Sequence, residues 1–150
     1  MGKKQIASTS QEETIKESEK IDANLKKEVK VKQSSRVSEG RVYVSSSYNN
    51  TLVTLTNNKG QVLSTKSAGA AGFKGTKKST SFAASRVAEA VANICKKLGM
   101  EKVEVFIKGI GAGRESAVRT LVNQGINVIS IKDITPIPHN GCRPKKVRRV

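Results

Sequence analysis

The alternation of strand and helix patterns in the second half of the sequence constrains the fold most strongly. An alanine-rich helix is expected to begin at Ser79 or Thr80 and to end near Leu98, because Ser and Thr cap helix N-termini and apolar residues then recur on one face. After it the patterns predict a strand, a helix and a strand, over Val103–Ile107, Arg114–Gln124 and Ile126–Ile131. Strands joined by helices pair in parallel, so this half predicts parallel pairing.

The segment before this helix favours antiparallel strands instead. Two runs rich in β-branched residues cover Arg41–Ser47 and Thr51–Thr56, and Gln61–Lys66 follows as a third predicted strand. The turn signals Tyr48-Asn49-Asn50 and Asn57–Gly60 separate them, which indicates a three-stranded meander. Together the two halves predict one α/β domain with a mixed five-stranded sheet and helices on the sheet faces.

Composition divides the 150 residues into an arm, a body and a tail. Residues 1–40 are rich in Lys, Glu, Ser and Gln and lack aromatic residues, so we expect a mostly disordered arm. Ile21, Leu25 and Val29 could still form the apolar face of a short helix over Glu12–Lys32. The arm resembles neither a secretory signal nor a transit peptide, which favours a cytoplasmic protein over an organellar one. Residues 41–133 form the predicted α/β domain, and 134–150 a tail without periodicity.

The charge of the chain restricts its partners. Lys and Arg number 28 against 12 Asp and Glu, a formal net charge of +16. The arm holds nine basic and seven acidic residues, whereas 41–150 holds 19 basic and five acidic residues, and no acid occurs from Gly40 through Ala88. Such a body repels itself unless a polyanion neutralises it. No apolar run approaches the ~18 residues of a membrane span, so a membrane partner is not expected.

A glycine-containing loop from Lys66 to Lys78 is the first candidate anion site. Its cations Lys66, Lys74, Lys77 and Lys78 lie among small residues with no carboxylate nearby. Glycine lets backbone N–H groups approach phosphates closely, and the loop leads into a helix N-terminus, whose dipole favours anions. We therefore favour phosphate contact over a merely solvated basic loop.

The tail is the second candidate. It holds all three prolines of the chain, which keep it extended, and its cations are Arg143, Lys145, Lys146, Arg148 and Arg149. An extended basic segment can lie between nucleic-acid backbones, although a solubilising tail or a basic import signal has the same composition.

The pair Asn140-Gly141 is prone to succinimide formation, so Asn140 is a candidate for isoaspartate. The alternative is an ordinary turn in which Gly141 adopts a positive φ.

The third candidate is the glycine loop KGIGAGRES, Lys108–Ser116. Its G-x-G-x-G spacing matches neither the Rossmann fingerprint nor a P-loop, so a nucleotide cofactor is the weaker interpretation. We favour Arg114 at the helix start against an RNA phosphate, or simple tight turning.

Catalysis finds little support in the sequence. The body has five acids, Glu89, Glu101, Glu104, Glu115 and Asp133, and none lies on the first three predicted strands. A two-metal nuclease needs several converging carboxylates there. Cys95, Cys142 and His139 come from distant segments and are too few for a disulfide scaffold or a four-cysteine zinc site. We expect no catalytic residue, cofactor or metal.

Four segments together carry a family resemblance, in order and spacing over about 110 residues. They are Tyr48–Thr56 (YNNTLVTLT), Ala68–Ser79 (AGAAGFKGTKKS) with Phe82-Ala83-Ala84, Lys108–Ser116 (KGIGAGRES) and Asp133–Arg143 (DITPIPHNGCR). With them the chain resembles the universal small-subunit ribosomal protein family S-eleven, in the bacterial and organellar form of its tail. It departs from the family where Ile110 and Ala112 replace the two usual prolines of the glycine loop, and where Val147 interrupts the basic end.

The resemblance implies a ribonuclease-H-like, three-layer fold that binds RNA without catalysis. It implies binding of small-subunit ribosomal RNA on the platform, bridging of several RNA helices, and a part in the Shine-Dalgarno cleft that holds messenger RNA. The implied protein neighbours are ribosomal proteins S-seven and S-eighteen and initiation factor three.

Residue roles follow from the same resemblance. Asn49 and Asn50 would contact sugar or base edges. The lysines of the Lys66–Lys78 loop and Arg114 would contact phosphates. The tail would extend between RNA backbones, and its contacting residues would be His139, Asn140, Arg143, Lys145, Lys146, Arg148 and Arg149. Aromatic residues are only 3% of the chain, so we expect recognition by shape and backbone, without stacking. Two rival functions are a nucleotide-dependent enzyme and a DNA-compacting protein.

Overall fold

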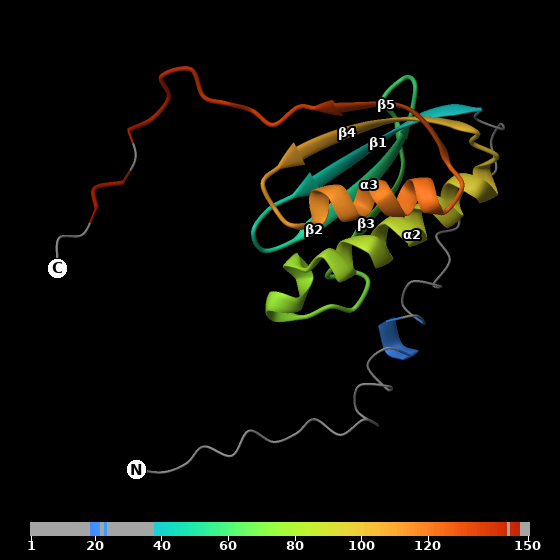
Figure 1. The fold of residues 1–150 in the computed structure, drawn as a ribbon, viewed down its shortest axis with the longest axis horizontal. Helices are drawn as coiled ribbons and strands as arrows, with labels where there is room; N and C mark the ends of the chain where they lie inside the picture. Colours follow the sequence, from blue (N-terminus) through green and yellow to red (C-terminus); the bar gives the residue numbers. More distant parts are fainter. Residues whose placement is uncertain (1–18, 22, 24–37, 144, 148–150) are drawn as a thin grey trace, which may run out of the picture.

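Five strands form one mixed sheet in the order β3-β2-β1-β4-β5 (Figure 1). Their bounds are β1 Glu39–Ser46, β2 Thr51–Asn57, β3 Val62–Ser67, β4 Lys102–Gly109 and β5 Asn127–Asp133. The computed structural model describes residues 19–21, 23, 38–143 and 145–147. β1 pairs antiparallel with β2, and β2 with β3, whereas β1 pairs parallel with β4, and β4 with β5. The predicted α/β domain and its mixed five-stranded sheet are confirmed.

The strand sequences explain which face of the sheet is covered. In the central strand β1, Val42 and Val44 are fully buried while Tyr43 between them is half-buried, as period-two alternation requires. Val44 pairs with Val53 of β2 and with Ile107 of β4, so apolar residues meet across three strands. The bounds of the observed strands differ from the predicted ones by two residues at most.

Two helices connect the parallel strands, and their ends follow the predicted capping signals. α2 spans Ser81–Leu98, and the Thr80 hydroxyl accepts the Ala83 N–H at 3.2 Å. Gly99, at φ 72°, ends this helix in the left-handed conformation. α3 spans Gly113–Asn123 and is followed by Gly125 at φ 79°.

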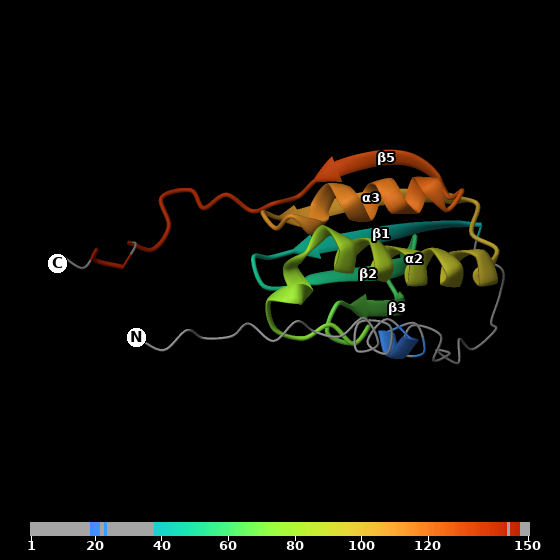
Figure 2. The same cartoon turned by 60° about the horizontal axis from the view of Figure 1, so that its bottom comes forward.

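Both helices lie on the same face of the sheet and contact each other (Figures 1 and 2). The described residues therefore form two layers in place of the three expected. Crossover connections between parallel strands are right-handed, and here the connections from β3 through α2 to β4 and from β4 through α3 to β5 proceed in the same direction along the sheet. Equal handedness and equal direction place both helices on one side.

The core lies between this helical layer and the sheet. Val87, Val91 and Cys95 of α2 are fully buried against the strands, and Ala117 and Leu121 contribute from α3. Fully burying a valine or leucine side chain stabilises the fold by about 1.5–3 kcal/mol. The many buried alanines of α2 let the helix approach its neighbours closely, which suits a chain with few large apolar residues.

Only a short part of the predicted arm is described. Residues 19–21 and Ala23 are helical, and Ile21 is half-buried against the hydrophobic core. Leu25 and Val29, the other members of the predicted apolar face, lie outside the described residues, as does most of the arm predicted to be disordered. Among the residues described, no helix combines the length and the apolar composition that crossing a membrane requires.

Candidate nucleic-acid interface

One end of the sheet gathers most of the predicted RNA-contacting segments. The carboxyl ends of β1, β3, β4 and β5 meet there, together with the N-termini of α2 and α3 (Figures 1 and 2). We call this the strand-carboxyl end. The β1–β2 turn, the Lys66–Lys78 loop, the glycine loop and the start of the tail all lie at it. The topology therefore brings together segments that are up to about 90 residues apart in sequence.

The β1–β2 turn is fixed by its own hydrogen bonds. The Ser47 N–H donates to the Asn50 carbonyl at 2.9 Å, and the Asn50 N–H donates to the Ser47 hydroxyl at 3.1 Å. The Thr51 N–H donates to the Asn50 side-chain oxygen at 3.0 Å. Asn50 is half-buried and partly committed to the turn, whereas Asn49 is exposed at its tip. Of the two predicted amide contacts, Asn49 is therefore the more accessible.

The Lys66–Lys78 loop, which we call the basic loop, is anchored to the core by small and aromatic residues. Ala68, Ala71 and Phe73 are buried, and the N–H groups of Ala71 and Phe73 donate to the Ser67 and Ala68 carbonyls. These anchors turn the chain so that its cations stay at the surface. Lys74 and Lys77 are exposed and Lys66 and Lys78 are half-buried.

The loop ends in a short 3-10 helix, η1 Gly75–Ser79, which the sequence patterns do not predict. Lys77 and Lys78 lie in its last turn, directly before the N-terminus of α2. The first turn of α2 carries no acidic residue, so the helix dipole and the two lysines add to one positive field.

Arg114 lies where the sequence predicts, in the first turn of α3, but it has partners within the chain. Its guanidinium donates to the Gly109 carbonyl at 2.8 Å and forms an ion pair with Asp133. Asp133 also accepts the Thr135 N–H at 2.8 Å and the Thr135 hydroxyl at 2.6 Å. The Thr135 hydroxyl in turn accepts the Gly109 N–H at 3.0 Å. We call Arg114, Asp133, Thr135 and Gly109 the tail latch, because they tie the first tail residues to the glycine loop.

The glycines of the KGIGAGRES loop are required by close packing. A Cβ at Gly109 would collide with the Ser46 carbonyl, and one at Gly111 with the Ser47 carbonyl. A Cβ at Gly113 would collide with the Thr51 hydroxyl. The loop is pressed against the end of β1, and the Gly111 N–H donates to the Ser46 carbonyl at 2.9 Å. Tight turning thus accounts for the spacing that suggested a nucleotide loop.

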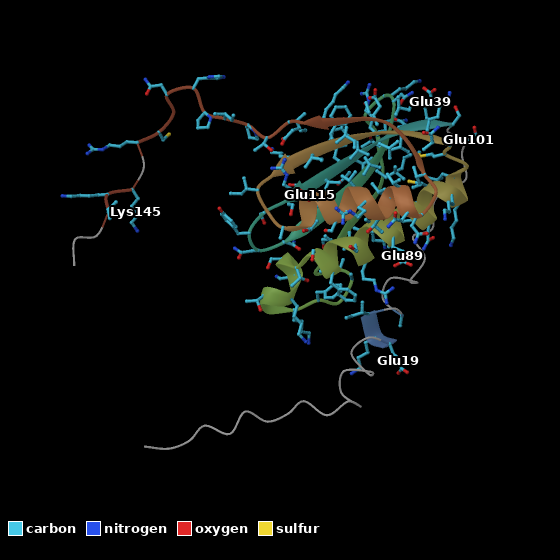
Figure 3. The ribbon with its side chains drawn as sticks, in the orientation of Figure 1. Glu19, Glu39, Glu89, Glu101, Glu115 and Lys145 are labelled. Carbon is cyan, nitrogen blue, oxygen red and sulfur yellow. The ribbon has the colours of Figure 1, made fainter. Side chains whose placement is uncertain are left out.

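The tail leaves the sheet in a fixed direction and then extends away from the body (Figure 1). The Ile134 N–H donates to the Ile107 carbonyl at 2.8 Å, which continues the parallel pairing by one step. The predicted contacts His139, Asn140, Arg143, Lys145 and Lys146 are all exposed, and Figure 3 shows Lys145 far from the sheet. Arg148 and Arg149 lie outside the described residues.

The Asn140-Gly141 turn differs from the expected ordinary turn in which Gly141 has a positive φ. Asn140 has the positive φ, 51°, and it is the one non-glycine residue with a positive φ in the described chain. Gly141 does not have a positive φ; a Cβ there would lie 3.0 Å from the Pro138 Cβ. Glycine at 141 is therefore explained by crowding against a proline ring, and not by left-handed backbone.

Comparison with known proteins assigns the family. The family model described as "Ribosomal protein S11" matches residues 40–149. The "Small ribosomal subunit protein uS11" of Treponema pallidum (strain Nichols) is 53% identical over 121 residues, which cover 81% of this chain and 96% of that protein. The protein of the same name from Borreliella burgdorferi (strain ZS7) is 51% identical over 133 residues, covering 89% and 99%. The chain belongs to the ribosomal protein S11 family.

A further S11 relative extends the range of sources. The "Small ribosomal subunit protein uS11c" of Chlorella vulgaris is 51% identical over 126 residues, covering 84% of this chain and 97% of that protein. The S11 family match begins at residue 40, one residue after the start of β1, so most of the arm lies outside it.

Among the residues that the structure describes in this S11-family chain, most acids are paired or lie away from the strand-carboxyl end. Arg41 pairs with Glu104 at 3.2 Å and Arg86 with Glu89 at 3.2 Å. Glu39 and Glu101 lie at the opposite end of the sheet, whereas Glu115 lies in the first turn of α3, where the helix dipole favours an acid (Figure 3). The positive charge of the strand-carboxyl end is therefore little offset.

The cysteines and the histidine give no converging site among the described residues. Cys95 is buried in α2, and burial raises the pKa of its thiol to about 12, so it stays protonated at neutral pH. Cys142 and His139 are exposed in the tail.

Sequence reasoning missed residues that act through the backbone. The sequence motifs predict no role for Thr135, although an Asp two residues before a Thr is typical of a turn in which the carboxylate accepts the later N–H. Ser46 and Thr51 are buried, and their hydroxyls lie 3.2 Å apart beneath the glycine loop. No local pattern marks this pair, because the loop they support is some 60 residues further along the chain.

Proposed function

We propose that the chain is a structural constituent of the small ribosomal subunit and binds small-subunit ribosomal RNA through the strand-carboxyl end and the tail. The observation that carries this proposal is the convergence of the β1–β2 turn, the basic loop and the tail at one end of the sheet. The relatives named uS11 support the subunit, since their names place them in the small ribosomal subunit.

The role is binding and not catalysis. Lysines beside a helix N-terminus recognise phosphates by charge and shape, which suits folded RNA whose grooves offer backbone and 2′-hydroxyls. The glycine loop is filled by the end of β1 and Thr51, which disfavours the nucleotide-dependent enzyme. The remaining rival, a DNA-compacting protein, would bind duplex DNA as tightly as structured RNA at equal salt.

The finer placement follows the family resemblance. We propose that the protein lies on the platform, bridges several RNA helices and helps to form the Shine-Dalgarno cleft beside messenger RNA. Its neighbours there would be ribosomal proteins S-seven and S-eighteen, with initiation factor three as a transient partner, in ribosomes of the cytoplasm. The arm would take no large part in RNA binding, because its charges nearly balance.

The salt dependence of RNA affinity tests the proposed interface. Replacing Lys74, Lys77 and Lys78 with Gln should weaken binding to a small-subunit ribosomal RNA fragment and reduce the log–log salt slope by roughly 0.7–0.9 for each phosphate that the variant no longer neutralises. Neutralising Arg143, Lys145 and Lys146 should do the same, with folding unchanged, because these tail residues are exposed. Lys59→Gln and Lys102→Gln, exposed at the opposite end, are the matched controls. Unchanged slopes in both test variants would refute the interface.

A further inference from the structure

Tyr48 is the aromatic residue that the fold leaves without a partner. The chain has two Tyr, three Phe and no Trp, and all five rings are described. Tyr43 stacks on Phe106 with ring centroids 5.0 Å apart, and Phe73 meets Phe82 edge to face at 6.0 Å. Tyr48 has no ring, cation or hydrogen-bond partner in the described chain and is 74% exposed. A single exposed ring needs no explanation by itself, so the surroundings of Tyr48 decide whether the ring has a binding role.

The setting is a turn that holds the ring outward. Ser47 and Asn50 close the turn by backbone and side-chain hydrogen bonds, and the Asn49 N–H also donates to the Ser47 hydroxyl at 3.4 Å. Below the turn, Ser46 and Thr51 are buried against the glycine loop. Tyr48 and Asn49 are thereby presented at the tip of a braced hairpin, which reduces the ordering cost of a contact made by the ring.

The ring also lies at the charged end of the molecule. The turn joins β1 to β2 at the strand-carboxyl end, where the basic loop and the start of the tail lie as well (Figure 1). Proteins read unpaired RNA bases by stacking them on aromatic rings beside cations that hold the backbone. Phe82, the other strongly exposed ring, is less suited to this, because Phe73 meets it edge to face and the Arg86 guanidinium lies 5.8 Å from its centroid.

We propose that Tyr48 is a stacking contact for an unpaired base of ribosomal RNA, with the exposed Asn49 amide beside it to bond the base or sugar edge. The proposal rests on the proposed function, since it needs RNA at the strand-carboxyl end. It also revises the expectation that a chain with few aromatic residues binds RNA without stacking: one braced ring is enough for one base.

Affinity and salt dependence together separate stacking from charge. Tyr48→Leu in the full chain should weaken binding to a small-subunit ribosomal RNA fragment roughly 5- to 150-fold, because stacking on an aromatic ring contributes about 1–3 kcal/mol per base. The salt slope should stay unchanged, since the uncharged ring neutralises no phosphate. Tyr48→Phe keeps the ring and should retain most of the affinity. Val62→Ala is the matched control, because Val62 is apolar, 62% exposed and at the opposite end of the sheet.

Tyrosine fluorescence reports the ring directly. In the Tyr43→Phe variant Tyr48 is the sole Tyr of a chain without Trp, so its excited-state lifetime should shorten when saturating RNA stacks on it. In the Tyr48→Phe variant the remaining Tyr43, half-buried against Phe106, should keep its lifetime.

The possible results distinguish this proposal from the proposed interface. An unchanged Tyr48 lifetime overturns stacking. Full RNA affinity in Tyr48→Leu also overturns it, and the interface remains supported if the variant of Lys74, Lys77 and Lys78 has a reduced salt slope. If Tyr48→Leu keeps RNA affinity but fails to assemble into subunits, the ring contacts a protein neighbour and stacking is again refuted. If the lysine variant also keeps its slope, the interface itself fails.

Discussion

At the residue scale, Arg114 shows why a side chain's role depends on distant partners. Its place at a helix start suggests a phosphate ligand, but folding brings Asp133 and the Gly109 carbonyl to its guanidinium. Asp133 is 19 residues away along the chain, on the next strand, so no local pattern predicts the ion pair. By contrast, the exposure of Lys74 and of the described tail cations Arg143, Lys145 and Lys146 could be predicted, because lysine and arginine rarely become buried without a partner.

The first prediction concerns the ionisation of Asp133. The Thr135 hydrogen bonds, followed by the hydrogen bond and the charge of Arg114, lower the pKa of Asp133 below its ordinary value of 3.8. A carboxylate with a lowered pKa contributes stability above its ordinary pKa and loses it as the pH falls through the folded-state value. The tail latch should therefore be intact at neutral pH and weaken only below about pH 4.

The carboxyl chemical shift of Asp133, measured by NMR as a function of pH, tests whether the Thr135 hydrogen bonds are the main cause of its lowered pKa. Thr135→Val removes the hydroxyl and should raise the pKa of Asp133 toward 3.8, whereas Thr135→Ser keeps the hydroxyl and should leave it low. A pKa above 3.8 in the unaltered chain, or no change in Thr135→Val, would contradict the latch.

At the scale of elements, the sequence predicts the strands and helices well and their layering less well. Alternation in the strands and the caps Thr80 and Gly99 are local signals, so their elements appear where expected. The 3-10 helix Gly75–Ser79 has no periodic signal, because it is five residues long and begins at a glycine with φ 54°. The common side of α2 and α3 depends on strand order, which no single segment encodes.

The glycine loop gives a prediction at this scale. Gly111→Ala should lower the free energy of unfolding by about 1–3 kcal/mol, because its Cβ would collide with the Ser47 carbonyl and the Ser46 hydroxyl. Gly69→Ala is the control, since its Cβ would meet only ordinary contacts such as the Lys78 side chain at 3.7 Å. Urea unfolding measures both. Equal stabilities of the two variants would show that the loop is not pressed against β1.

At the scale of the whole molecule, charge is distributed unequally between the two ends of the sheet. The strand-carboxyl end and the tail concentrate cations, while Glu39 and Glu101 lie at the opposite end (Figure 3). Composition alone predicts a polyanionic partner, but only the topology shows that separate basic segments share one end. The arm holds nine basic and seven acidic residues, so its charges nearly balance.

Removal of the arm tests that division. Deleting residues 2–37 keeps Ser38, whose carbonyl accepts the N–H groups of Glu101 and Lys102. RNA affinity should remain nearly intact, and Tm should fall by only a few degrees, because Ile21 is half-buried against the core. Ile21→Ser in the full chain should reproduce the fall in Tm. A loss of RNA affinity on deletion would assign the arm to the interface.

Lysine footprinting of assembled small subunits tests the central claim most directly. Acetylation followed by peptide mass spectrometry compares the reactivity of each lysine in the isolated protein and in the subunit. If RNA occupies the strand-carboxyl end and the tail, then Lys74, Lys77, Lys78, Lys145 and Lys146 should lose most of their reactivity on assembly. Lys59 and Lys102, exposed at the opposite end, should keep theirs. Protection of Lys59 and Lys102 with continued reactivity of the loop and tail lysines would contradict the proposed interface.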